Sequence, residues 1–267
     1  MIDTTANLVI SKSNEVFLKI NTEPHIEYEL RDHFKFEVPN AKFMPQYRGR
    51  NWNGEIHLYD MRSKQIYVGL LDKIVQFCDN YGYSYKFEDN KFYGTPYEEN
   101  DHISLEGVKD YMNSICSHIP RKYQIEGVYG ALKHNRKLLI SPTASGKSLM
   151  IYSLVRYYVD RGEKILLVVP TTSLVEQMYK DFLDYGWDVD SYCHRIYSGK
   201  EKSNKAPVTI TTWQSVYKLE RSFFEEYGVI IGDEAHLFKS KSLIQIMTKL
   251  HHAKYRFGFT GTLDGTQ

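Results

Sequence analysis

The sequence lacks the features that mark membrane, secreted and disulfide-rich proteins. Only three cysteines occur in 267 residues and none stands at C-x-x-C spacing, so neither a zinc site nor a disulfide framework is indicated. The longest apolar run, around residues 165–170, is too short to span a bilayer. The N-terminus lacks the basic-then-apolar pattern of a signal peptide. We therefore expect a cytoplasmic protein with no membrane partner.

Net charge is also small. The 34 basic and 33 acidic residues leave a formal charge of +1. No global field therefore draws the protein toward DNA, and any affinity for nucleic acid must come from local patches. The length of the chain allows one large domain or two modest ones.

A polar stretch divides the sequence into two parts. Residues 88–102 contain Gly94 and Pro96, which is typical of a linker or a long loop. We expect a small α+β domain over residues 1–100 and a larger domain over residues 101–267.

The first part contains a mixture of short elements. Residues 14–20 alternate like a half-buried strand, and residues 23–34 can form a helix that opens on a proline. Asn53-Gly54 predicts a hairpin turn because both residues tolerate positive φ. Residues 69–81 have the apolar spacing of an amphipathic helix.

In the second part, short apolar strands alternate with helical stretches. This alternation predicts an α/β domain with a parallel sheet covered by helices on both faces. Ligands of such sheets bind at the carboxyl ends of the strands. The expected helices are residues 149–158 and 173–185. The expected strands are residues 137–140, 164–169, 208–211, 228–232 and 255–259.

Residues 141–148, SPTASGKS, follow the first of these strands and precede a helix. That is the context of a phosphate-binding loop, G-x-x-x-x-G-K-S/T, although Ser141 stands in place of the first glycine. Gly146 lets the backbone approach a phosphate, Lys147 would reach the β- and γ-phosphates, and Ser148 would hold Mg²⁺. Taken alone, the stretch also fits a lysine at the start of an ordinary helix.

A second motif, Asp233-Glu234-Ala235-His236, follows the fourth apolar strand. A carboxylate at the end of a parallel strand can face the phosphate loop and hold Mg²⁺, and Asp233 has that position. Glu234 beside it can orient and deprotonate an attacking water. An acid-rich surface turn is the alternative, but the joint occurrence with the loop predicts an ATP site.

The two motifs together resemble helicase superfamily 2, in which the loop often begins with alanine, so Ser141 is a mild departure. Residues 120–124, PRKYQ, resemble the adenine-recognition element of that family. Residues 169–174 and 211–215 resemble its DNA-contacting motifs, and residues 259–263, FTGTL, resemble the motif that links hydrolysis to strand movement. The resemblance implies a RecA-like lobe over the second part of the chain.

The resemblance also implies a role for each matching residue. The residues that the resemblance assigns to catalysis are Lys147, Asp233, Glu234 and His236. ATP binding falls to Arg121, Gln124, Thr143, Ala144, Ser145, Gly146, Lys147 and Ser148, with Mg²⁺ on Ser148 and Asp233. DNA contacts fall to Thr171, Thr172, Thr212, Trp213 and Gln214. Coupling falls to Thr260 and Thr262, which His236 would reach as a relay unless it is a histidine in an ordinary polar network.

The first part of the chain narrows the family. Residues 47–60 and 77–83 resemble the N-terminal domain of the UvsW-type phage helicases, which remodel forks, Holliday junctions and RNA–DNA loops. Independently, Arg48, Arg50 and Trp52 lie in a basic stretch with interleaved aromatics, which suits phosphate contact and stacking on DNA. For Trp52, an aromatic on the buried face of a hairpin is the alternative.

We therefore expect a superfamily 2 DNA helicase (DEAH box) that acts on branched DNA with ATP and Mg²⁺, in phage DNA replication, recombination or repair in the host cytoplasm. The family's second lobe and its arginines do not follow, so we expect a monomeric fragment that is weak or inactive alone. The alternatives are a double-strand translocase of a restriction system, a small-molecule P-loop kinase, and a non-catalytic DNA-binding module with a residual nucleotide site. Branch preference, polarity and the choice between RNA and DNA stay open.

Overall fold

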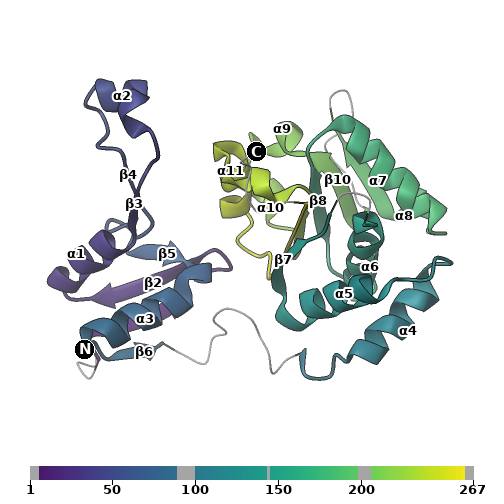
Figure 1. Cartoon of the computed structure of the whole chain (residues 1–267), viewed down its shortest axis with the longest axis horizontal. Helices are drawn as coiled ribbons and strands as arrows, with labels where there is room; N and C mark the ends of the chain where they lie inside the picture. The colour runs from purple at the N-terminus through teal and green to yellow at the C-terminus, as the bar shows by residue number, and fades with distance from the viewer. Residues whose placement is uncertain (1–5, 89–99, 143–144, 198–205, 262–267) are drawn as a thin grey trace. The chain divides into compact units, whose positions relative to one another are not determined.

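The computed structural model describes residues 6–88, 100–142, 145–197 and 206–261 (Figure 1). The chain divides into two compact units, Met1–Gly94 and Thr95–Gln267, hereafter unit 1 and unit 2. In these described ranges no helix is both long and apolar enough to cross a bilayer.

Unit 1 is built on a four-stranded mixed sheet with the order β5-β2-β1-β6. Two helices, α1 (Pro24–His33) and α3 (Leu71–Tyr81), bury their apolar stripes in one cluster with the sheet. Both helices agree with the sequence prediction, because each carries a clear apolar stripe. The strands are β1 (Leu8–Lys12), β2 (Phe17–Thr22), β5 (Gln65–Tyr67) and β6 (Tyr85–Phe87), with the 3₁₀ helix η2 (Val68–Leu70) before α3.

Residues 35–57 of unit 1 form a separate feature, which we call the arm (Figure 1). Its stem is an antiparallel pair of β3 (Lys35–Glu37) and β4 (Glu55–His57). Between them lie the 3₁₀ helix η1 (Ala41–Phe43) and α2 (Pro45–Arg48).

The prediction of a two-residue hairpin at Asn53-Gly54 is wrong. Strand β3 ends at Glu37 and its partner β4 begins at Glu55. All of residues 38–54 therefore connect the two strands, not a two-residue turn. Gly54 does have positive φ, +88°, and its carbonyl accepts the Val38 N–H at 2.8 Å. A Cβ there would lie 3.0 Å from the Ala41 Cβ, so the glycine closes the arm's loop.

Unit 2 contains a six-stranded, fully parallel sheet with the order β7-β12-β11-β8-β10-β9. The five predicted strands are all present. The edge strand β9 was not predicted, because its central His194 and Arg195 break the apolar pattern. The strands are β7 (Arg136–Ile140), β8 (Ile165–Val169), β9 (Cys193–Ile196), β10 (Val208–Thr212), β11 (Val229–Gly232) and β12 (Tyr255–Thr260).

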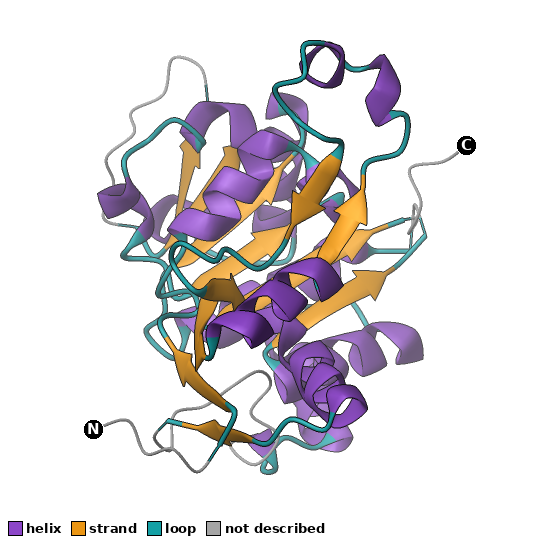
Figure 2. Cartoon of the chain, turned by 90° about the vertical axis from the view of Figure 1, so that its left-hand side faces the viewer, coloured by secondary structure: helices purple, strands orange, loops and turns teal. Residues whose placement is uncertain are grey.

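Helices cover both faces of this sheet (Figure 2), which confirms the predicted fold class. Alternate residues of β8 belong to different clusters: Leu167 packs with one helical layer and Leu166 with the other. The first layer holds α4 (Leu105–Ile115), α5 (Lys122–His134), α6 (Lys147–Val159), α7 (Thr172–Asp184) and α8 (Val189–Tyr192). The second holds α9 (Trp213–Val216), α10 (Arg221–Phe224) and α11 (Lys241–Lys249), with η4 (Ala235–Lys239) before α11.

The sheet order places three chemically important chain segments side by side. Strand β12 lies between β7 and β11. Because the strands are parallel, the loop after β7, the acidic turn after β11 and the end of β12 meet at one edge of the sheet.

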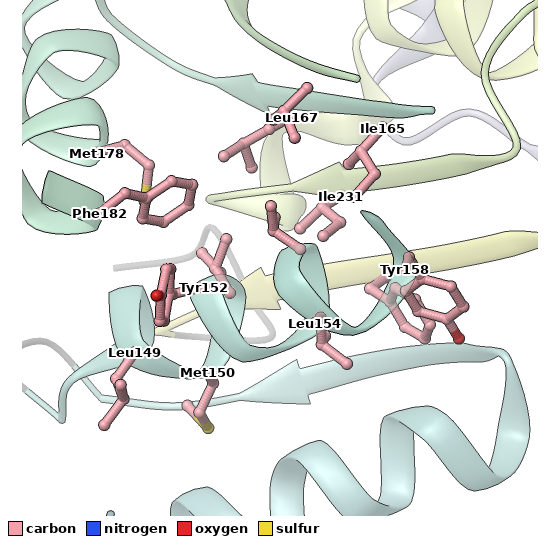
Figure 3. Packing of buried hydrophobic residues seen from close by; sticks show 14 of the residues in the cluster. Leu149, Met150, Tyr152, Leu154, Tyr158, Ile165, Leu167, Met178, Phe182 and Ile231 are labelled. Atoms are coloured by element: carbon pink, nitrogen blue, oxygen red, sulfur yellow. The ribbon is translucent and has the colours of Figure 1, made fainter. Parts of the chain in front are cut away.

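The core of unit 2 gives a test of its packing. Phe182 on α7 is fully buried, and its ring lies 5.3 Å from that of Tyr152 on α6 (Figure 3). We expect Phe182→Ala to lower the free energy of unfolding by about 3–5 kcal/mol, because it leaves a cavity. Leu183→Ala, one residue on and more than half exposed, should change it by about 0.5 kcal/mol or less. Urea denaturation followed by circular dichroism measures both, and equal effects would contradict this description of the core.

Candidate nucleotide site and basic arm

The phosphate loop of unit 2 joins β7 to α6. Gly146 precedes the helix with φ +78°, and a Cβ there would lie 2.4 Å from the Gln124 Nε2, so only glycine fits. Ser141, in the place of the first glycine, does not have positive φ. It is buried, its N–H donates to the Thr260 carbonyl at 2.8 Å, and its hydroxyl bonds that of Ser145. A serine therefore closes this loop without the freedom of a glycine.

Residues at the start of α5 hold the phosphate loop through hydrogen bonds. The Gln124 amide donates to the carbonyls of Ser145 and Gly146 at 3.0 and 3.3 Å, and its oxygen accepts the Arg121 N–H at 2.8 Å. The Tyr123 hydroxyl donates to the same Ser145 carbonyl at 2.6 Å. A glutamine side chain can form two hydrogen bonds with adenine, one as donor and one as acceptor. Both amide hydrogens of Gln124 are already used within the protein, so this pairing is not preformed.

Lys147 brings the two predicted motifs together. Its Nζ donates to Oε1 of Glu234 at 2.9 Å and lies 3.8 Å from Oδ1 of Asp233. Asp233 is buried, and its N–H donates to the Val168 carbonyl of β8. Burial raises the pKa of Asp233, and the Lys147 charge opposes that rise. The carboxylate is thus held in place and favours a nearby cation.

His236 extends this arrangement to β12. Its Nδ1 lies 3.0 Å from the Thr260 Oγ1 and 3.3 Å from the Glu234 Oε2. Thr260 is buried at the end of β12, and its carbonyl is the one that accepts the Ser141 N–H. A continuous set of contacts therefore runs from the acidic turn through β12 to the phosphate loop. Three residues predicted for this site, Thr143, Ala144 and Thr262, lie outside the described residues.

A pocket of about 350 Å³ lies at this edge of the sheet. It is lined by residues of the loop, of α6 and α7 and of the acidic turn, among them Lys147, Ser148, Asp181 and Asp233. The Ser148 hydroxyl bonds the Tyr185 hydroxyl at 2.8 Å. Asp181 and Tyr185 were not predicted, because they belong to no motif and approach the loop only through the packing of α7 on α6.

The residues present fit a magnesium ion that is shared with a nucleotide. In the described ranges no group of three or more His, Cys, Asp or Glu side chains could hold a metal alone. Mg²⁺ does not need such a cage, since it usually takes one or two protein oxygens together with phosphates and waters. Ser148 and Asp233 line one pocket, and the Asp233 Oδ1 is buried with no hydrogen-bond partner. Apart from the Lys147 ammonium at 3.8 Å, that oxygen has no polar partner among the described residues, so its lone pairs are available to a metal ion.

The residues predicted to contact DNA from unit 2 follow two adjacent strands, β8 and β10. Thr171 and Thr172 are exposed, and the Thr171 hydroxyl caps α7 by accepting the Leu174 N–H at 3.3 Å. Gln214 is exposed as well. By contrast, Thr212 is buried and Trp213 packs against a core cluster. The structure thus leaves the two threonines and Gln214 accessible, and holds Thr212 and Trp213 in structural contacts.

The arm of unit 1 carries Arg48, Arg50 and Trp52. The two arginines are exposed and, with Arg31 and Lys42, line a hollow of about 920 Å³. Trp52 is half-buried, and its Nε1 donates to the Glu55 carbonyl at 2.6 Å. The indole therefore fastens the tip of the arm to its stem.

Two known families match the chain. Residues 117–265 match the family described as "Type III restriction enzyme, res subunit". Residues 11–88 match the family described as "DNA helicase UvsW, N-terminal". The first match covers the candidate nucleotide site from residues 121–124 to the end of β12, and the second covers most of the sheet and the arm of unit 1.

Individual proteins agree with these matches. "ATP-dependent DNA helicase uvsW" of Enterobacteria phage T4 is 34% identical over 257 residues, which are 92% of this chain and 50% of that protein. "DNA 3'-5' translocase XPB2" of Sulfurisphaera tokodaii is 32% identical over 145 residues, 53% of this chain and 30% of that protein. A crystal structure of the UvsW helicase from bacteriophage T4 has a TM-score of 0.84 at 32% identity, covering 96% of this chain and 92% of the crystallised one.

The chain spans at most about half the length of these curated relatives. The family match covers more than half of the chain, and the similarity to UvsW of phage T4 extends through both units. The chain therefore belongs to the superfamily 2 family described as "Type III restriction enzyme, res subunit", and it carries an N-terminal unit of the UvsW kind.

Proposed function

We propose that the chain supplies the first RecA-like, ATP-binding lobe (residues 101–267) and an accessory DNA-binding domain (residues 1–100) of a DNA helicase that acts on branched DNA. The observation that carries this proposal is the meeting of the phosphate loop, the acidic turn and β12 through Lys147, Glu234, His236 and Thr260. The relative from phage T4, which is named an ATP-dependent DNA helicase, matches through both units.

In this proposal each residue of the nucleotide site has a defined task. Backbone N–H groups at Gly146 and the start of α6 cradle the phosphates. Lys147 leaves Glu234 and turns to the β- and γ-phosphates, which frees Glu234 to orient and deprotonate the attacking water. Ser148 and Asp233 would hold Mg²⁺, which neutralises charge on the phosphates when bound. Ser148 must then exchange its contact with Tyr185 for the ion.

The contacts of β12 suit a coupling role. His236 touches both Glu234 and Thr260, and Thr260 is also bonded to Ser141 at the start of the loop. A change at Glu234 during hydrolysis would therefore reach the end of β12 through His236. We assign Thr260 to this relay, and Thr262 follows it in the sequence.

We propose branched DNA as the substrate of the helicase. Forks and Holliday junctions are the substrates that the UvsW resemblance favours, with RNA–DNA hybrids as a further class. A monomer acting in replication, recombination or repair in the host cytoplasm fits a phage helicase. The resemblance implies that arginines of a second lobe also stabilise the transition-state charge on the γ-phosphate.

Two other functions are kept as alternatives. A double-strand translocase of a restriction system is favoured by the description of the matching family. Unwinding of branched DNA without long-range translocation would exclude it. A non-catalytic DNA-binding module with a residual nucleotide site is disfavoured, because Lys147, Asp233 and Glu234 keep a complete set of contacts.

Lys147→Ala tests the nucleotide site. It removes a charged donor to the phosphates, so the affinity for ATP should fall about tenfold to a hundredfold. Titration with a fluorescent ATP analogue in Mg²⁺ measures this. Lys109→Ala, on the surface of α4, is the control and should bind as the unchanged protein does. Equal affinity of both variants would refute the assignment.

Glu234→Gln separates binding from chemistry. The amide keeps the shape but cannot accept a proton, so single-turnover phosphate release should slow by about 10²–10⁴-fold. Affinity for ATP should stay the same or rise, because the ion pair that holds Lys147 is gone. Glu106→Gln on the surface of α4 is the matched control. Unchanged phosphate release would assign the proton transfer to another group.

Arg48→Ala combined with Arg50→Ala tests the arm. Each arginine that neutralises a phosphate contributes about one to the slope of log affinity against log salt. We expect the double variant to bind DNA more weakly and with a slope reduced by about two. Lys73→Ala, exposed on α3, should leave both quantities unchanged. A slope that does not change in the double variant would remove the arm from the DNA interface.

A further inference from the structure

The arm gathers apolar side chains that nothing in unit 1 covers. Seven large apolar side chains are exposed among the described residues of unit 1, and four of them belong to the arm. Phe36 and Ile56 are partners in the β3–β4 ladder and lie on the same face of the stem. Phe43 and Met44 lie between the strands, in and after η1. Scattered exposed apolar residues need no explanation, whereas a gathering of them on one small feature is typical of a contact site.

Phe43 is the most exposed of these, with 71% of its surface accessible. A hollow of about 580 Å³ opens beside it and is also lined by Tyr47 and Asn53. The other prominent aromatic of the arm, Trp52, has its N–H bonded to the Glu55 carbonyl. Phe43 is therefore the most exposed aromatic of the arm, ahead of Phe36 at 46%, and the hollow leaves room for a flat group against it.

The tip is held rigidly around Phe43. The Phe43 N–H donates to the Asn40 carbonyl at 3.0 Å, and the Met44 N–H donates to the Ala41 carbonyl at 2.9 Å. Asn40 has φ +59°, a left-handed conformation that asparagine tolerates. The ring is thus presented on a fixed backbone, so little conformational entropy is lost when it binds.

Basic residues lie on both sides of this aromatic in the loop. Lys42 lines the hollow of Phe43 together with Glu37, and it also lines the neighbouring hollow with Arg48, Arg50 and Glu55. In the described part of the chain, no carboxylate lies within ion-pair distance of these three basic residues. A protein-docking surface would favour an apolar centre with few charges, whereas an exposed aromatic in the same loop as three cations without ion-pair partners matches a nucleic acid, which offers both phosphates and base faces.

We propose that Phe43 is a wedge that stacks on a base at the branch point of DNA while Lys42, Arg48 and Arg50 hold the phosphates around it. The proposal rests on the proposed function in that it takes DNA as the partner of the arm. Proteins insert Phe or Met between bases at the expense of unstacking them. That expense is lowest where bases are already unpaired, so the wedge prefers a branch to a plain duplex.

The test compares DNA binding by Phe43→Ala, Phe43→Trp and Tyr28→Ala in the whole 267-residue chain. Tyr28 is an exposed aromatic of α1 and serves as the matched control. The probes are a three-way fork with 2-aminopurine at the branch point and a plain duplex of the same length. Phe43→Ala should bind the fork about tenfold more weakly, the loss of one stacked base, without the change in 2-aminopurine fluorescence. Its affinity for the plain duplex should be unchanged, and Phe43→Trp should retain both fork affinity and signal.

The outcomes distinguish the wedge from the function on which it rests. If the unchanged chain binds the fork and Phe43→Ala behaves like Tyr28→Ala, the wedge is refuted and the DNA-binding role stands. If the unchanged chain binds neither the fork nor the plain duplex, both the DNA-binding role of unit 1 and the wedge are refuted. If Phe43→Ala alters only self-association in sedimentation, the tip contacts protein instead. Because Phe43 is exposed, the thermal unfolding of Phe43→Ala should match that of the unchanged chain.

Discussion

The contact of Lys147 with two carboxylates is the interaction on which the proposed nucleotide site depends. Asp233 is buried and would resist ionisation without a cation beside it. Lys147 supplies that cation and at the same time bonds Glu234. The pair fixes the acidic turn against the start of α6, so two segments 86 residues apart share one geometry. In the proposed function, a nucleotide would have to compete with these carboxylates for Lys147, so its binding would release Glu234.

The contacts that join the acidic turn to the phosphate loop through Thr260 require the strand order of unit 2. Only because β12 lies between β7 and β11 can Thr260 bond both His236 and the loop residue Ser141. Strands β8 and β11 are buried on both faces, whereas β7 at the edge is mostly exposed, so the centre of the sheet is held by the core and not by the site. The polar residues at the strand ends can therefore change contacts without cost to the sheet.

Much of this arrangement could be predicted from local pattern. Five strands of unit 2 and two helices of unit 1 follow from apolar spacing, and the loop and acidic turn follow from short motifs in the right context. The residues that were missed depend on long-range packing. Tyr185 reaches Ser148 only because α7 packs on α6, and the edge strand β9 has no continuous apolar run. The arm was misread because Asn53-Gly54 allows positive φ in any loop, not only in a hairpin.

Two of the aromatics of the arm, Trp52 and Phe43, show why composition alone misassigns a surface. Trp52 lies among arginines in the sequence and has the larger ring, yet its N–H is tied to the Glu55 carbonyl and the ring is half-buried. Phe43 has no polar atom that the arm could bind, so no hydrogen bond draws it inward, and the backbone bonds of η1 fix it outward. An indole is useful for bracing a loop because it combines an apolar body with a donor. A phenyl ring lacks the donor, and on an exposed, rigid tip its remaining use is contact with another flat, apolar surface.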